Sequence, residues 1–201
     1  NLKISQIIKH PNWNMGKKIS VDSSTLMNKV LEVIEASKIF NFDKNKYRIV
    51  IHPQSYVHSI IRFKNGLIKM ILYNTDMKIP ISNILYGKKN QVLNIKKIDL
   101  KKLNTLNFQD VNSNRFPSVK LINKCLNLGT LAPTILNASN EVLVDLFLSN
   151  KIGFLDIVKK INVIFKDKDF NKYARRNLNT IKDIKIADNW ARLKTNNMCV
   201  R

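Results

Sequence analysis

Residues 22–40 read DSSTLMNKVLEVIEASKIF, and this stretch decides how the first part of the chain folds. Its apolar residues recur at the three- and four-residue spacing of one helix face: Leu26, Met27, Val30, Leu31, Val33 and Ile34. The pattern predicts a helix of about four turns over residues 24–40. Polar residues 22–24 precede the apolar run and are typical of a helix start.

The other side of this predicted helix is polar, and four residues share an arc of roughly 120° there: Asn28, Lys29, Glu32 and Glu35. The plain structural interpretation is an ion pair between Lys29 and Glu32 on a solvated face. A functional interpretation is also open, because Ser23 and Ser24 would place hydroxyls beside the unpaired amides of a helix start, where phosphate binds. Lys29 would reach the same anion, and Glu32 would suit a divalent cation or a substrate hydroxyl.

Just before this helix, residues 10–16 read HPNWNMG and combine a titratable His10, a large aromatic Trp13 and a hinge-capable Gly16. Such a segment forms either a lid over a site or a local packing anchor.

Beyond the helix, three runs of β-forming residues follow at 47–51, 56–63 and 67–73. Asn65-Gly66 lies between the last two runs and predicts a hairpin. Residues 81–87 suggest a short helix, and the Lys- and Asn-rich stretch after it predicts an exposed connection.

After residue 117 the pattern becomes helical, with predicted helices at 118–128, 140–149, 154–165 and 181–194. Ser139 is the expected N-cap of the second of these. We therefore expect an α/β (α+β) segment with a mostly antiparallel or mixed sheet, followed by an all-α helical bundle. The predicted domains are residues 1–86, a connector at 87–112, and residues 113–201.

The 201 residues include 35 Lys+Arg against 14 Asp+Glu, a formal net charge of +21. Such an excess suggests a polyanionic partner, but residues 1–100 carry 17 basic and 6 acidic groups, and residues 101–201 carry 18 and 8. No arm or stripe concentrates the charge, so we expect no specific nucleic acid partner. Cys125 and Cys199 lack a CxxC spacing, which favours a reduced, cytoplasmic setting. No apolar run is long enough to span a membrane.

Four segments in order, HPNWNMGKKISVDSSTLMNKVLEVIEA, IHPQSYVHS, TDMKIP and TILNASNEV, closely resemble 1-deoxy-D-xylulose 5-phosphate reductoisomerase. The resemblance implies conversion of 1-deoxy-D-xylulose 5-phosphate to 2-C-methyl-D-erythritol 4-phosphate in non-mevalonate isoprenoid biosynthesis. It further implies NADPH and a divalent cation, Mg²⁺, Mn²⁺ or Co²⁺, as cofactors. A homodimer formed through the sheet of the catalytic domain is also implied.

The resemblance also implies roles for individual residues. Those that bind the phosphorylated sugar would be His10, Ser23, Asn28, Lys29 and Glu32, with His10, Lys29 and Glu32 catalytic and Glu32 a metal ligand. Those of the flexible flap would be Trp13 and Met15, and those near NADPH would be Gly16 and Met77. Those lining the pocket as secondary contacts would be Ser55 and His58.

One departure from the family is large. No counterpart appears of the Rossmann-like NADPH domain or of the Asp-Ser-Glu motif that supplies the other two metal ligands, and the chain contains no G-x-G-x-x-G. We therefore expect a carboxy-terminal part of the enzyme that is inactive alone. Two alternatives stay open: a noncatalytic basic binding module, and a degenerate remnant of the enzyme.

Overall fold

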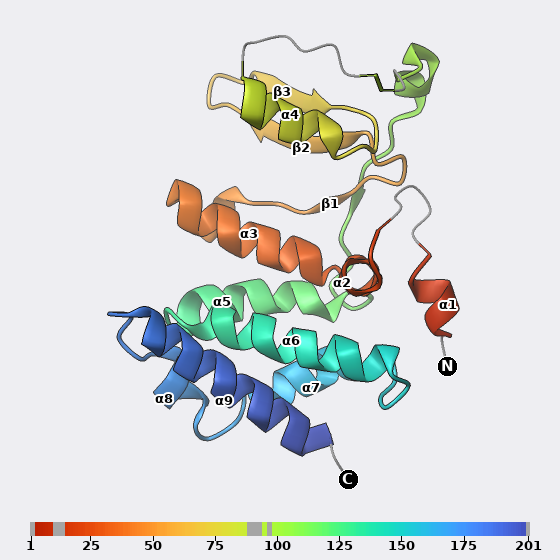
Figure 1. Ribbon diagram of the computed structural model, residues 1–201. Coiled ribbons are helices and arrows are strands. Elements are labelled where there is room, and N and C mark those ends of the chain that lie inside the picture. The colour runs from red at the N-terminus through yellow and green to blue at the C-terminus, as the bar shows by residue number, and fades with distance from the viewer. Residues whose placement is uncertain (1–2, 10–14, 88–93, 96–97, 200–201) are drawn as a thin grey trace. The chain divides into compact units, whose positions relative to one another are not determined.

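The computed structural model describes residues 3–9, 15–87, 94–95 and 98–199. It contains two compact units (Figure 1). Unit 1 gathers Met15–Arg48 and Asn112–Arg201 with the first residues of the chain, and unit 2 includes Ile49–Val111. This division differs from the sequence-based one, because the helix that carries the polar arc packs with the carboxy-terminal helices.

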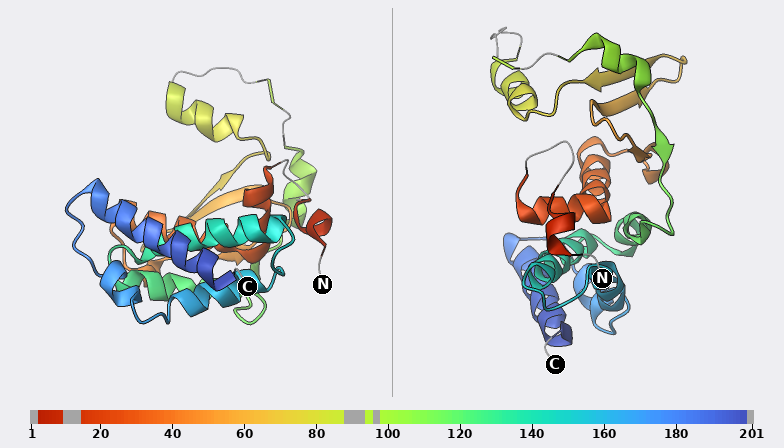
Figure 2. Two further views of the ribbon diagram at one scale, coloured as in Figure 1. Left: turned by 60° about the horizontal axis from the view of Figure 1, so that its bottom comes forward. Right: turned by 90° about the vertical axis from the view of Figure 1, so that its right-hand side faces the viewer.

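Unit 1 is helical. Its α-helices are α1 (Ile4–Ile7), α2 (Lys17–Thr25), α3 (Met27–Phe40), α5 (Leu121–Leu128), α6 (Ala132–Leu148), α7 (Asp156–Ile164), α8 (Phe170–Ala174) and α9 (Ile181–Cys199). Two short 3₁₀ helices, η1 (Lys44–Lys46) and η3 (Pro117–Lys120), complete it. Helix α6 is central: it contacts α2, α3, α5, α7, α8 and α9, and α9 lies alongside it in all views (Figures 1 and 2).

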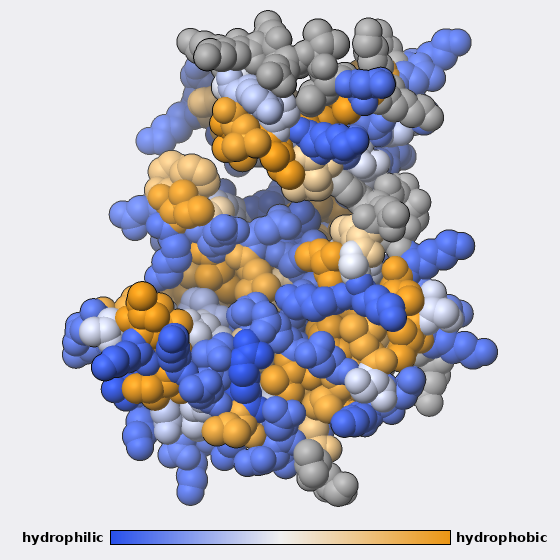
Figure 3. Space-filling model, viewed as in Figure 1, coloured by the Kyte–Doolittle hydropathy of each residue, from blue (hydrophilic) through white to orange (hydrophobic). Residues whose placement is uncertain are grey.

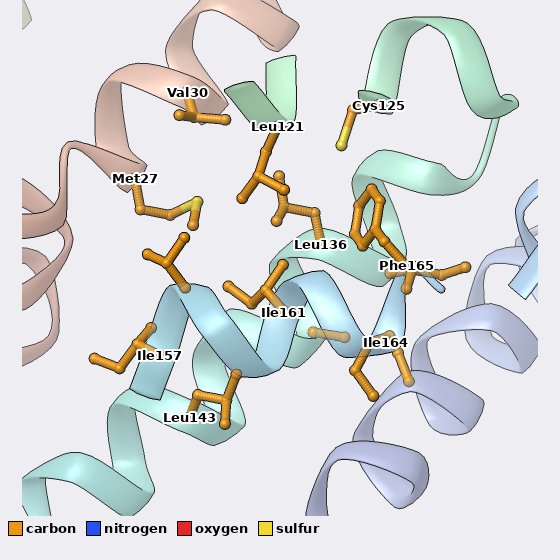
Figure 4. Close-up of a cluster of buried hydrophobic side chains, with 14 of the residues drawn as sticks. Met27, Val30, Leu121, Cys125, Leu136, Leu143, Ile157, Ile161, Ile164 and Phe165 are labelled. Atoms are coloured by element: carbon orange, nitrogen blue, oxygen red, sulfur yellow. The ribbon is translucent and has the colours of Figure 1, made fainter. Parts of the chain in front are cut away.

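The core of unit 1 joins residues from both ends of the sequence (Figure 4). Met27 and Val30 of α3 meet Leu121 of α5, Leu136 of α6 and Ile161 of α7, and all five side chains are fully buried. Full burial of such a side chain stabilises the fold by about 1.5–3 kcal/mol. Hydrophobic burial therefore fixes α3 against the carboxy-terminal helices.

The predicted single helix over residues 24–40 is in fact the second of two. Helix α2 ends at Thr25, Leu26 adopts a left-handed conformation with φ of 58°, and α3 begins at Met27. The predicted start at residues 22–24 was wrong, because Ser23 and Ser24 lie in the last turn of α2. Apolar periodicity continues across a single left-handed residue, so it does not reveal such a break.

The predicted helix over residues 140–149 was too short. Helix α6 begins at Ala132, next to Pro133 in its first turn, and Ser139 and Asn140 lie buried in its interior. Ser139 is therefore no N-cap, since the polar pair interrupts an apolar face without ending the helix. The helices predicted at 118–128, 154–165 and 181–194 correspond to η3 with α5, α7 and α9. Helix α8 and helices α1 and α2 were not predicted.

Unit 2 contains the predicted hairpin. Strands β2 (Val57–Arg62) and β3 (Ile68–Leu72) pair antiparallel, with Ile60 opposite Met70. At the turn, Gly66 has a φ of 89°, which glycine adopts without strain. Two-residue strands β1 (Val50–Ile51) and β4 (Gln109–Asp110) form a second antiparallel pair, and β4 was not predicted. Helix α4 (Lys78–Tyr86) and the 3₁₀ helix η2 (Leu100–Thr105) complete the unit.

The fold class is as predicted: an α+β part with small antiparallel sheets, and an all-helical part. On the face shown in Figure 3, hydrophilic residues form most of the surface, with hydrophobic patches between them. Among the helices of the described residues, none has both the length and the apolar character needed to cross a membrane.

Candidate functional site

The junction between α2 and α3 brings the predicted polar residues together, and we call residues 23–29 the α2–α3 corner. Leu26 donates its backbone N–H to the carbonyl of Ser23, which closes the last turn of α2. The chain then turns into α3, so that Asn28 Nδ2 lies 3.4 Å from Ser23 Oγ and donates to it. The Oδ1 atom of Asn28 is buried and has no hydrogen-bond partner in the described part of the protein. Two polar side chains thus meet beside the first turn of α3.

Lys29 and Glu32 form the ion pair that the plain structural interpretation predicts. Lys29 Nζ lies 2.8 Å from Glu32 Oε2, and the two side chains are 43% and 54% exposed. An ion pair that is this exposed contributes at most about 1 kcal/mol. Either side chain can therefore turn to another partner at little cost.

The two serines of the corner have different surroundings. Ser24 Oγ donates to the carbonyl of Ser20 over 3.0 Å and lies 3.4 Å from that of Ile7, so its hydroxyl is hydrogen-bonded to backbone carbonyls of unit 1. Ser23 Oγ is instead within reach of Asn28. Of the two hydroxyls, only that of Ser23 belongs to the polar cluster of the corner.

Behind the corner lies a polar cluster that sequence reasoning missed. Asp22 is 1% exposed, and its two carboxylate oxygens lie 2.7 Å from Lys18 Nζ and 2.8 Å from Asn140 Nδ2. Ser118 Oγ donates to the carbonyl of Thr25 over 2.5 Å. The one signal in the sequence is the placement of Asp22 and Asn140 among residues of apolar faces.

The remaining predicted residues of unit 2 are Ser55, His58 and Met77. His58 stacks on Tyr73 with ring centroids 3.7 Å apart, and its Nε2 lies 3.0 Å from the Tyr73 carbonyl. Ser55 has a φ of 56°, and the half-exposed Met77 precedes α4. Their roles toward substrate and NADPH stay predictions.

The predicted substrate contact His10 and the predicted flap residue Trp13 lie outside the described residues. Met15 is half-buried. Gly16 is the N-cap of α2, and its carbonyl accepts from Ser20 Oγ over 3.0 Å. A Cβ at Gly16 would meet no atom within 4 Å, so packing within the described chain does not require glycine there.

The described residues do not by themselves fit a divalent cation. Nowhere in the described ranges do three or more His, Cys, Asp or Glu side chains gather in a group that could hold a metal. Glu32 can supply one carboxylate, whereas Mg²⁺ takes near-octahedral oxygen coordination. The chain therefore offers one ligand of such a site rather than the site itself.

Comparison with known proteins matches both parts of the chain to one family. Residues 72–194 match the model described as DXP reductoisomerase C-terminal domain. Residues 1–40 match the model described as 1-deoxy-D-xylulose 5-phosphate reductoisomerase C-terminal domain.

Relatives of the same name agree with the models. The 1-deoxy-D-xylulose 5-phosphate reductoisomerase of Pelagibacter ubique strain HTCC1062 is 43% identical over 200 residues, which are 100% of this chain and 52% of the relative. That of Clostridium novyi strain NT is 41% identical over 189 residues, 94% of this chain and 48% of the relative. The chain thus spans about half the length of these curated relatives.

Solved structures extend the likeness to the fold. A crystal structure of DOX-P reductoisomerase in complex with NADPH, fosmidomycin and magnesium has a TM-score of 0.94 at 32% identity, covering 98% of this chain and 50% of that one. The reductoisomerase from Zymomonas mobilis in complex with NADPH has a TM-score of 0.86 at 32% identity, with the same coverage. On the match of both family models, the chain belongs to the 1-deoxy-D-xylulose 5-phosphate reductoisomerase family and corresponds to its carboxy-terminal part.

Proposed function

We propose that this chain forms the carboxy-terminal part of an active 1-deoxy-D-xylulose 5-phosphate reductoisomerase, and that the α2–α3 corner binds its phosphorylated sugar substrate. The enzyme would convert 1-deoxy-D-xylulose 5-phosphate to 2-C-methyl-D-erythritol 4-phosphate. The observation that carries the proposal is the Oδ1 atom of Asn28, which is buried beside Ser23 and Lys29 and has no hydrogen-bond partner among the described residues. A buried acceptor without a partner costs about 1–3 kcal/mol, and a substrate hydroxyl would relieve that cost.

The corner has the donors that a phosphate requires. Lys29 supplies a cation and Ser23 supplies a hydroxyl. The first turn of α3 adds the positive end of the helix dipole, although the N–H of its first residue, Met27, already donates to Thr25 Oγ1. Asn28 Nδ2 already donates to Ser23 Oγ, which leaves the hydroxyl hydrogen of Ser23 for an anion. A phosphorylated sugar offers both an anionic group for these donors and hydroxyls for Asn28 Oδ1.

Substrate binding would break the ion pair between Lys29 and Glu32, so that Lys29 binds the phosphate and Glu32 binds a divalent cation. Lys29 Nζ turns from Glu32 to the phosphate, where a charge-assisted hydrogen bond is stronger than an exposed ion pair. Glu32 is then a free carboxylate one helical turn from the phosphate donors. In this proposal it contributes one oxygen ligand to a divalent cation that other segments of the intact enzyme also hold.

The cofactors of the proposal are NADPH and Mg²⁺, Mn²⁺ or Co²⁺. Support comes from the solved relatives, which include complexes with NADPH and with magnesium. We assign Gly16 and Met77 to NADPH. His10 would contact substrate, Trp13 and Met15 would belong to the flap, and Ser55 and His58 would line the pocket.

The partner of the proposal is a second copy of the enzyme, bound through the β2–β3 hairpin. A two-stranded hairpin is marginal by itself, and large exposed apolar areas mark interfaces. Seven large apolar residues of this hairpin are each at least 40% exposed: Ile60, Ile61, Phe63, Leu67, Ile68, Met70 and Ile71. A mass of two chains in light scattering of the intact enzyme is the expected result.

Steady-state kinetics of the intact enzyme test the substrate site. Lys29→Ala should lower kcat/KM for 1-deoxy-D-xylulose 5-phosphate by about 10–100-fold, because a charge-assisted hydrogen bond to the phosphate is lost. Lys38→Ala is the matched control, since it removes an exposed lysine from the last turn of the same helix. Equal kcat/KM values for the two variants would refute the site, and no NADPH oxidation by the wild type would refute the function.

A further inference from the structure

A buried hydrogen bond joins α6 to the last turn of α2. Asn140 Nδ2 donates to Asp22 Oδ1 over 2.8 Å, although the two residues are 118 positions apart. Asn140 is fully buried and Asp22 is 1% exposed. Lys18 Nζ lies 2.7 Å from the second carboxylate oxygen. Because a buried carboxylate is costly unless its oxygens are paired, this arrangement of α2 against α6 is strongly favoured over others.

A second tether holds the same turn from another element. The buried Ser118 of η3 donates its hydroxyl to the carbonyl of Thr25 over 2.5 Å. The two tethers therefore act at Asp22 and Thr25, on either side of Ser23. Successive helical side chains leave the axis about 100° apart, so fixing Asp22 toward α6 also fixes the direction of Ser23.

We propose that Asn140 is a positioning residue for substrate binding: through Asp22 it sets the rotation of α2 and thereby places Ser23 Oγ beside Asn28 and the bound phosphate. Asn140 acts through Asp22 and does not touch the substrate. The inference rests on the proposed function and adds to it the residue of the helical part that holds the phosphate donors in register.

The surroundings of Asn140 favour this role over a purely stabilising one. Its Oδ1 atom and the neighbouring Ser139 Oγ are buried and lack partners within the described residues. An unpaired buried acceptor destabilises the fold, and replacement of a buried polar pair by apolar residues is often neutral or stabilising. The buried residues around them on α6 are otherwise apolar, among them Leu136 and Leu143. A polar pair that costs stability is expected where it fixes one geometry.

The test uses the intact enzyme and separates binding from turnover. Asn140→Ala should raise KM for 1-deoxy-D-xylulose 5-phosphate about tenfold or more while kcat changes little, since the phosphate grip acts equally in ground and transition states. The inhibition constant of inorganic phosphate should rise in parallel. KM for NADPH should stay within about twofold of wild type.

Two further variants distinguish positioning from general destabilisation. Thr195→Val removes a buried hydrogen bond within α9, from Thr195 Oγ1 to the Ala191 carbonyl over 2.7 Å, and should lower Tm without moving KM. Asp22→Asn keeps a side-chain oxygen for Asn140 and should keep KM within about threefold of wild type even if Asn140→Ala proves too unstable to purify. A KM for Asp22→Asn that rises as far as that of Asp22→Ala would overturn the proposal.

A double-mutant cycle gives the sharpest outcome. If Asn140 acts through Asp22, then Asp22→Ala with Asn140→Ala should show no larger KM than either single variant. The positioning role would be overturned if the KM increases of the two single variants multiplied in the double variant, or if Asn140→Ala had the same KM as Thr195→Val. In either case, turnover by the wild type would leave the proposed function standing. Absence of wild-type turnover would overturn both.

Discussion

At the scale of single residues, the left-handed backbone conformation of Leu26 decides which side chains meet at the α2–α3 corner. Helical spacing placed Asn28, Lys29 and Glu32 on one arc, and the structure pairs Lys29 with Glu32. Helical spacing could not place Ser23 beside Asn28, because this contact depends on the φ of 58° at Leu26. Leucine rarely adopts this conformation, so helical spacing in the sequence gives no sign of it.

The two cysteines should differ sharply in reactivity. Cys125 is buried in the core, and burial raises the pKa of its thiol to about 12, so almost no thiolate forms near neutral pH. Cys199 is partly exposed at the end of α9. Brief alkylation of the native protein at pH 8, read by peptide mass spectrometry, should label Cys199 alone. Equal labelling of Cys125 without denaturant would contradict the packing of α5.

At the scale of helices and strands, the sequence predicted elements with clear periodicity and missed those fixed by long-range contacts. The β2–β3 hairpin was found from Asn65-Gly66, a local signal. Strand β4 pairs with β1 although the paired residues, Val50 with Asp110 and Ile51 with Gln109, are 60 and 58 positions apart in the sequence. No local pattern encodes such a pairing. The first half of α6 was not predicted, because the buried polar residues Ser139 and Asn140 interrupt the apolar pattern of this helix.

The loop between α5 and α6 should tolerate no side chain at Gly129. Its φ is 135°, and an added Cβ would overlap the backbone carbonyl of Ala174, which also accepts from the Leu131 N–H. Gly129→Ala should therefore cost about 2 kcal/mol or more in the free energy of unfolding. Gly66→Ala is the control, because that position is open and only its φ of 89° opposes a side chain. If Gly129→Ala and Gly66→Ala lowered the free energy of unfolding in urea equally, the close approach of the α8 backbone to Gly129 would be contradicted.

The start of α9 should make stability depend on acid pH. The Arg176 guanidinium and the Thr180 amide bind the Asp183 carboxylate and hold its pKa at about 2, below its usual 3.8. A lowered pKa stabilises the fold above pH 3.8, and this stabilisation is lost as the pH falls through about 2.

The Asp183→Asn variant should therefore be less stable than wild type at pH 5 and should lose less stability between pH 4 and pH 2. Asp145→Asn, which alters an exposed carboxylate of α6, should follow the wild-type curve in the same thermal unfolding series. If the stability of Asp183→Asn and of the wild type fell in parallel with pH, the Asp183 carboxylate would have the same pKa in the folded and the unfolded protein, which would contradict this prediction.

At the scale of the whole molecule, motif order predicted the family and the fold class, whereas the grouping of segments came only from the structure. Helix α3, which carries the polar arc on one face, belongs with the carboxy-terminal helices, since Met27 and Val30 pack in the same core as Leu121 and Ile161. The sequence-based boundary missed this because a domain formed from distant segments leaves no signature in local composition. The helical part is thus joined directly to the proposed substrate site.

The most direct test of the account is NADPH oxidation by the intact enzyme with 1-deoxy-D-xylulose 5-phosphate and Mg²⁺ or Mn²⁺, comparing wild type with Glu32→Gln. Wild type should turn over, and Glu32→Gln should lose about 100-fold or more in kcat and need more metal for half-maximal rate, because one of few anionic ligands is gone. A wild-type enzyme that is folded but does not oxidise NADPH, or a Glu32→Gln metal titration that matches wild type, would contradict the account.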